Sequence, residues 1–281
     1  MADDPGQQPS TPRVRRGWRL LGIAGVVVVL AGALLLLVQA KSTPRNGESP
    51  AEARTKAASV GLRASDLPST WGAADPATAP LAGLLGSAPS TKETALDRRI
   101  TAEITKDYQS CVGLSDSRDR FFGKAGVQPL AQVPSLPFAL EGSAGVVEVG
   151  TATQRYGSTS SVDADKRQAA RSTFASCFGQ AMGRFVLSGA GQKAIRDTPV
   201  VVTQHLDAPL GVFVTGASAE LTYPGTAGVT PIEVGTTLLI AGHDEQYLYT
   251  FTTPGRFSNQ ERQALVDVLG ARLVAPSATS A

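Results

Sequence analysis

The chain has 281 residues, of which 42% are hydrophobic and 18% are charged, so it is long enough for one sizeable globular domain with appendages, and this composition excludes a disordered or fibrous protein. The net charge of +2 comes from the first 40 residues, where four arginines outnumber two aspartates. The remainder is neutral and has no stripe of lysine and arginine, which argues against a nucleic-acid partner because phosphate backbones require clustered positive charge.

An uninterrupted apolar segment lies near the N-terminus, at residues 20–38. A helix from Leu20 to Val38 reaches about 28 Å, close to the hydrocarbon core of a bilayer at about 30 Å. We therefore predict a single transmembrane helix. Trp18 suits the headgroup level, and the four arginines that precede the segment favour a cytoplasmic location for residues 1–19: Arg13, Arg15, Arg16 and Arg19.

A cleaved signal peptide is the alternative interpretation of this segment. Val38-Gln39-Ala40 resembles the small-residue pattern before a cleavage site. The apolar run is longer than the apolar region of an ordinary signal peptide, which favours a retained membrane anchor.

Residues 41–58 are rich in serine, threonine, proline, arginine and glutamate and predict a flexible stalk. The predicted domain follows over residues 60–275. Residues 276–281 predict a loose C-terminal tail.

The first half of this domain predicts helices around one strand. Ser90-Thr91-Lys92-Glu93 has the form of a capping box, and apolar residues then recur at helical spacing until Gly113, with the cysteine on the buried face: Leu96, Ile100, Ile104, Tyr108 and Cys111. Residues 114–144 contain three prolines and several glycines and predict a long loop, in which Phe138 must still pack. A strand over 146–156 leads to a helix capped by Ser161 or Asp163, with one apolar stripe: Ala170, Phe174, Cys177, Phe178, Ala181 and Phe185.

Cys111 and Cys177 are the only cysteines, and an even count in an exported domain predicts a disulfide. The loop that it closes is long, so on a chain-entropy model the bond stabilises the fold by about 4 kcal/mol. Two reduced thiols in a cytosolic domain, or one reactive thiol, are the alternatives.

The C-terminal third predicts strands and a last helix. Val200–Val202 is a short strand, and residues 212–223 form another with a bulge at Gly216. Residues 232–240 and 247–251 alternate as a hairpin around Gly242–Asp244. Ser258–Glu261 is a second capping box, and the helix that it opens points four residues inward: Leu265, Val268, Leu269 and Leu273. Four or five antiparallel strands with helices on one face predict an α+β fold.

Residues that could carry chemistry are sparse. His205 and His243 are the only histidines and lack metal-site spacing, and no nucleotide-binding loop has the required context, so we predict no metal site and no cofactor. Ser218 lies in Gly216-Ala217-Ser218-Ala219-Glu220, which lacks the second glycine of a nucleophile elbow. Tyr247 and Tyr249 share one strand face; core packing is the expected role, and a ligand groove is the alternative if that face of the sheet is uncovered.

The layout resembles the extracytoplasmic domains of actinobacterial envelope proteins. The features that carry the resemblance are Leu62-Arg63-Ala64-Ser65-Asp66-Leu67-Pro68 shortly before Trp71, a cysteine ahead of the first strand and a second cysteine in the following helix. Similar domains occur in small mycobacterial lipoproteins and as outer sensor domains of some serine/threonine kinases, with a fold akin to the PsbP type. The resemblance covers residues 60 to 275 and implies ligand binding or protein interaction without catalysis. This chain has no lipobox and no kinase domain, and no site residues are transferred.

These observations favour a membrane-anchored, non-catalytic binding or sensor module of the bacterial cell envelope, with an envelope ligand or protein as its partner. One alternative is an envelope hydrolase with a dispersed triad around His205 or His243. Another is a structural subunit of a larger membrane complex, in which Gly22, Gly25 and Gly32 supply helix contacts.

Overall fold

The computed structural model describes residues 47–75, 81, 95–114, 129–142, 145–189, 200–221, 232–253 and 257–275. The predicted cytoplasmic tail, transmembrane helix and C-terminal tail, at residues 1–19, 20–38 and 276–281, lie outside the described residues. Within the described ranges, no helix has the length and apolar character needed to cross a membrane.

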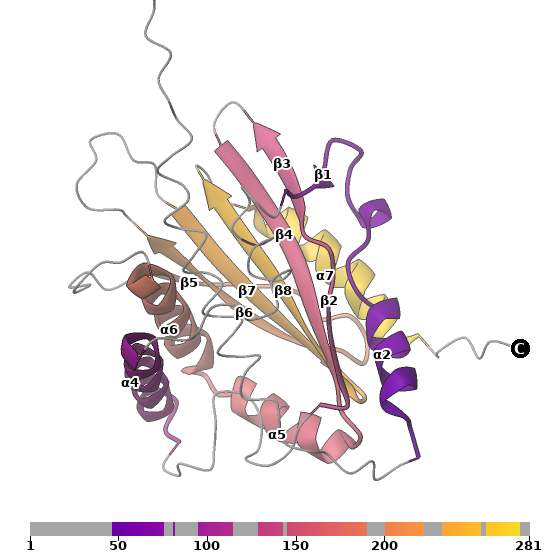
Figure 1. Cartoon of the computed structure of the whole chain (residues 1–281), viewed down its shortest axis with the longest axis horizontal. Helices are drawn as coiled ribbons and strands as arrows, with labels where there is room; N and C mark the ends of the chain where they lie inside the picture. The colour runs from indigo at the N-terminus through magenta and orange to yellow at the C-terminus, as the bar shows by residue number, and fades with distance from the viewer. Residues whose placement is uncertain are drawn as a thin grey trace, which may run out of the picture.

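An eight-stranded antiparallel sheet forms the centre of the domain (Figure 1). Strand β2 (Ala131–Pro134) pairs with the second half of β4, and β3 pairs with the first half. The other strands follow one another across the sheet in this order: β1 (Gly72–Ala73), β3 (Phe138–Gly142), β4 (Gly145–Arg155), β8 (Asp244–Thr253), β7 (Ile232–Ala241), β6 (Phe213–Leu221) and β5 (Val200–Thr203). The predicted α+β class with an antiparallel sheet is confirmed, and the sheet has more strands than predicted.

Strands β2 and β3 correct the prediction of a long loop over residues 114–144. Pro134 is the last residue of β2, and Pro137 lies between the two strands. Neither proline interrupts a central ladder, so the segment can pair with β4 despite its composition. Phe138 begins β3 and is buried against the core.

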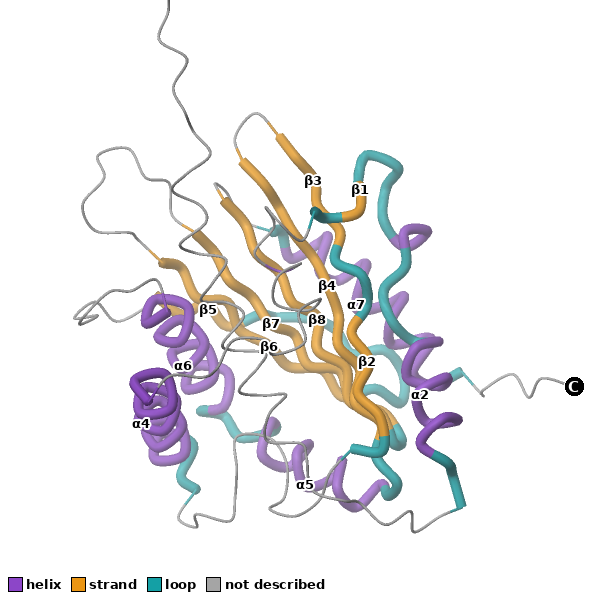
Figure 2. Tube along the Cα trace, viewed as in Figure 1, coloured by secondary structure: helices purple, strands orange, loops and turns teal. Residues whose placement is uncertain are grey.

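Helices cover both faces of the sheet, which corrects the prediction of helices on one face (Figure 2). On one face, α4 (Ala95–Cys111) and α6 (Phe174–Gly189) pack with Ala219, Val234 and Leu238. On the other face, α7 (Asn259–Val274) packs with Leu239 and Leu248. Strand β7 is consequently buried along its whole length, although its sequence alternates apolar with polar or small residues.

The predicted helix after β4 is two helices. Ser158, rather than Ser161 or Asp163, caps α5 (Thr159–Ala169), since its side chain accepts a hydrogen bond from the Ser160 amide. Ala170 ends α5 and is exposed, and the buried stripe continues on α6: Phe174, Cys177, Phe178 and Ala181. The side chain of Phe185 lies outside the described residues.

Gly216 does not form a bulge. The pairing of β6 with β7 continues without interruption from Phe213↔Ile240 to Leu221↔Ile232. A Cβ at Gly216 would lie 2.2 Å from Oε1 of Gln204 and 2.7 Å from the Thr236 carbonyl oxygen. Glycine is required at position 216 because Gln204 packs on the strand. The shift in the apolar pattern, which predicted a bulge, reflects burial of both faces of β6.

The hairpin and the last helix are confirmed. Strands β7 and β8 meet at Gly242, which has a φ of 57°. The Ser258 hydroxyl accepts from the Glu261 amide at 3.2 Å, and Glu261 Oε2 accepts from the Ser258 amide at 3.0 Å, so the predicted capping box is present at α7. Leu265, Leu269 and Leu273 point inward, but the fourth inward residue is Val266; Val268 is 37% exposed.

The described part of the predicted stalk is a docked helix. Helix α2 (Pro50–Ser59) has a capping box between Ser49 and Glu52, and Ala53 and Ala57 are fully buried. Beyond it, the Leu62 amide donates to Thr151 Oγ1 at 3.1 Å. The short helix η1 (Ala64–Asp66) follows, and the Arg272 guanidinium on α7 binds Asp66. The polar composition that predicted a stalk is therefore that of a surface helix that buries two alanines, together with its cap.

Candidate functional site

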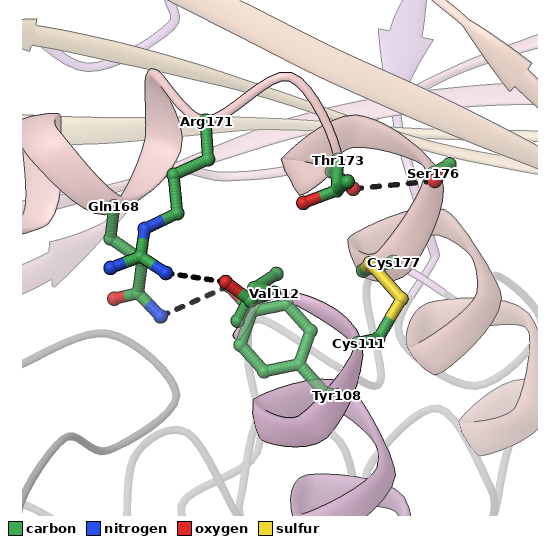
Figure 3. Close-up of a disulfide and its surroundings, with 8 residues drawn as sticks. All are labelled: Tyr108, Cys111, Val112, Gln168, Arg171, Thr173, Ser176 and Cys177. Carbon is green, nitrogen blue, oxygen red and sulfur yellow. Dashed lines mark hydrogen bonds between the residues drawn. A yellow bond between two sulfur atoms is a disulfide. The ribbon is translucent and has the colours of Figure 1, made fainter. Parts of the chain in front are cut away.

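The two cysteines form the predicted disulfide (Figure 3). Their Cα atoms are 5.7 Å apart, and the bond joins the last residue of α4 to the first turn of α6. Cys177 is buried, whereas Cys111 is exposed at the helix end, which corrects the prediction that it lies on a buried face. Beside the bond, Nη1 of Arg171 donates to the carbonyl oxygen of Val112 (Figure 3). The same atom also donates to the carbonyl oxygen of Gly113. This region clamps two helices together.

The residues of the hydrolase hypothesis do not form a triad in the described part of the chain. Ser218 is buried in β6 and its hydroxyl accepts from Nε2 of Gln204 at 3.3 Å. His205 is exposed in the connection from β5 to β6. His243 lies in the β7–β8 turn, with Nδ1 3.0 Å from the Tyr156 carbonyl oxygen. The contacts of these side chains are structural.

A polar cluster lies instead on the face of the sheet that carries α5 and α6. We call it the acid–tyrosine cluster, and it has five members: Gln154, Tyr156, Asp165, Glu245 and Tyr247. Strand alternation places Glu245 and Tyr247 on one face of β8, and the pairing of β8 with β4 puts Gln154 opposite Glu245. Asp165 reaches the same place from the buried side of α5.

Hydrogen bonds join the members of the acid–tyrosine cluster. The Tyr247 hydroxyl donates to Oε2 of Glu245 at 3.3 Å, and the Tyr156 hydroxyl donates to Oε1 of Gln154 at 2.9 Å. Glu245 is 0% exposed and Asp165 is 3% exposed. Two carboxyl groups thus share an interior site.

The electrostatics of this site favour a neutral acid. Burial, reinforced by the neighbouring Asp165 carboxyl group, raises the pKa of Glu245 well above its usual value. Burial and the Glu245 carboxyl group also raise the pKa of the Tyr247 phenol. Because two like charges are poorly accommodated in a low-dielectric interior, the Asp165 carboxyl group disfavours ionisation of Glu245.

The aromatic and acidic character continues along β4 and β8. The rings of Tyr247 and Tyr249 stack with centroids 6.1 Å apart, so the predicted common face is confirmed. Further along β4, the buried Glu148 accepts from the Leu81 amide at 2.8 Å. Helix α6 packs chiefly on β5 and β6. The other half of the same sheet face, formed by β4 and β8, therefore has a different and more polar surface.

A second buried polar group lies under α7. Nη2 of Arg262 is 3.4 Å from Oε1 of Glu233 and 3.3 Å from Oγ1 of Thr250. Burial lowers the pKa of Arg262, and Glu233 opposes this effect. The pair carries opposite charges and connects the helix to the sheet, which is a structural role.

Sequence reasoning missed the acid–tyrosine cluster. Glu245 follows the hairpin turn directly, where a carboxylate is expected in solvent, and Asp165 lies in a strongly polar helix. The available signal was the alternation of Glu245 with Tyr247 and Tyr249. Within the described ranges, no group of three or more histidine, cysteine, aspartate or glutamate residues could hold a metal ion.

Comparisons with known proteins return no relative: no family model, no curated protein and no solved structure matches the chain. The functional argument therefore depends on the residues of this chain.

Proposed function

We propose that the chain is a membrane-anchored, non-catalytic binding or sensor module of a bacterial cell envelope, like the extracytoplasmic domains that it resembles. Residues 20–38 anchor it, with the N-terminus in the cytoplasm and the domain outside. The disulfide between Cys111 and Cys177 supports an exported domain, because disulfides persist in oxidising compartments.

The observation that carries the sensor function is the burial of the acid–tyrosine cluster. Glu245 and Asp165 are enclosed, so a substrate does not reach them as it would reach the acid and base of an enzyme. A buried pair of carboxyl groups instead links the protonation state of the domain to its conformation, because ionisation inside the fold is unfavourable. An envelope domain meets the pH and solutes of the surroundings directly.

The hydrolase alternative requires Ser218 to be a nucleophile activated by histidine. The hydroxyl of Ser218 is bonded to Gln204, and His205 is exposed, so this arrangement does not favour acyl transfer.

Complementation of a deletion strain separates the two functions. Variants Ser218→Ala and His205→Ala/His243→Ala are expected to restore the envelope phenotype at normal protein levels, whereas Glu245→Gln is expected to change its dependence on external pH. Loss of complementation by stable Ser218→Ala and histidine variants would favour the hydrolase.

A further inference from the structure

The chain between the proposed membrane anchor and the folded domain is short. Val38 ends the apolar segment, and Glu48 is the first of the described residues whose side chain pairs with the rest of the domain. Oε2 of Glu48 lies 3.0 Å from Nε of Arg155, and Oε1 lies 2.7 Å from Nζ of Lys56. The intervening residues span at most about 35 Å when fully extended.

The attachment point identifies which end of the domain is held near the membrane. Arg155 is the last residue of β4, and Nη1 of Arg155 also lies 2.6 Å from Oδ2 of Asp244, where β8 begins. Helix α5 starts a few residues later. Figure 1 shows the start of α2, the end of β4 and α5 together at the lower end of the sheet. The opposite end of β4 is about 35 Å away.

The exposed side of α5 carries more positive than negative charge. Lys166 and Arg167 are exposed on α5, with Asp163 as the acidic residue on the same helix surface. By contrast, Glu48 and Asp244 are both paired with Arg155 at this end. Lys166 and Arg167 are thus exposed basic side chains at the end of the domain where residue 48 enters the fold.

We propose that α5 lies on the outer surface of the membrane, with Lys166 and Arg167 contacting anionic lipid headgroups. The inference rests on the proposed anchor at residues 20–38. Two observations carry it: the tether brings this end of the domain to the bilayer, and clustered basic side chains near an anionic surface are attracted to it. The acid–tyrosine cluster lies beneath the same helix, so contact of α5 with the membrane places that cluster next to the interface.

Fluorescence quenching in membranes tests the orientation. The full-length chain is reconstituted in phosphatidylcholine vesicles with a minority of phosphatidylglycerol and a nitroxide quencher on the headgroups. A fluorophore is attached at Ala170→Cys, at the end of α5, or at Glu141→Cys, exposed on β3. Several-fold stronger quenching is expected at position 170 than at position 141. Equal quenching at both positions in protein that resists alkaline extraction would overturn the inference and leave the anchor intact.

The charge contact has its own test in the same vesicles. Lys166→Gln/Arg167→Gln is expected to reduce quenching at position 170 to the value in pure phosphatidylcholine, whereas Lys106→Gln, an exposed change on α4, is expected to leave it unchanged. Unchanged quenching in the double variant would refute the headgroup contact. Release of the protein by alkaline extraction would instead refute the anchor, and with it the proposed function.

Discussion

At the residue scale, Glu245 makes the stability of the domain depend on pH. The pKa of Glu245 is higher in the folded state than in the unfolded state. Its contribution to the free energy of unfolding is therefore fully present below its pKa in the unfolded chain, and it is lost as the pH rises toward its pKa in the folded domain. Removing the ionisable proton with Glu245→Gln should therefore flatten the decline in the free energy of unfolding as the pH rises above about 4. Denaturant titration at a series of pH values measures this difference.

The exposed Glu141→Gln is the matched control and should follow the wild-type curve. Glu48 and Asp66 act in the opposite direction: hydrogen bonds from basic partners outweigh burial and lower the pKa of each, so their contribution is lost as the pH falls. Parallel curves for wild type and Glu245→Gln would contradict the assignment of Glu245.

Gly235 is a second residue whose role can be tested directly. A Cβ there would lie 2.3 Å from Oγ1 of Thr250 and 3.0 Å from Nη2 of Arg262, in the polar group under α7. Gly235→Ala should lower the free energy of unfolding by about 1–3 kcal/mol because the site is already filled. Gly72→Ala, where a Cβ meets nothing within 4 Å, is the control. Equal stability of the two variants would show that the packing at Gly235 is looser than described.

At the element scale, α2 is part of the fold. Ala57 is buried under the helix and Ala58 is exposed, so a matched pair of substitutions distinguishes docking from a free stalk. Ala57→Glu should cost at least about 2 kcal/mol, because it buries an unpaired charge, and Ala58→Glu should stay within about 0.5 kcal/mol of wild type. Thermal unfolding measures both. If neither substitution lowered the free energy of unfolding, residues 50–59 would be a flexible stalk and not a docked helix.

Elements with strong local signals could be predicted from the sequence. The capping box at Ser258, the alternation of β7 and β8 and the helical spacing before Cys111 each specify their structure locally. Helix α2 was missed because its small apolar face consists of alanines, and β2 and β3 were missed because their pairing with β4 is a tertiary effect that composition does not encode.

The candidate site was harder to predict than the fold. Asp165 and Glu245 are brought together only when α5 packs against the sheet, so neither residue carries a local signal of burial. The disulfide was accessible because the chain offers only one pair of cysteines. The exposure of Cys111 could not be predicted, because the helix ends at that residue and leaves the core there.

At the scale of the whole molecule, an antiparallel sheet is covered on both faces and stapled by one disulfide. We propose that a short tether holds this domain close to a membrane. The disulfide requires an oxidising compartment. The proposed tether holds the domain near a membrane only if residues 20–38 are a membrane anchor. Location is therefore the claim on which the proposed sensor function depends.

Thiol labelling of Cys111 and Cys177 in intact cells, before and after reduction and with membrane and soluble fractions separated, tests this claim most directly. We expect labelling only after reduction, and only in the membrane fraction. Free thiols without reduction, or a soluble labelled protein, would contradict an exported and anchored domain.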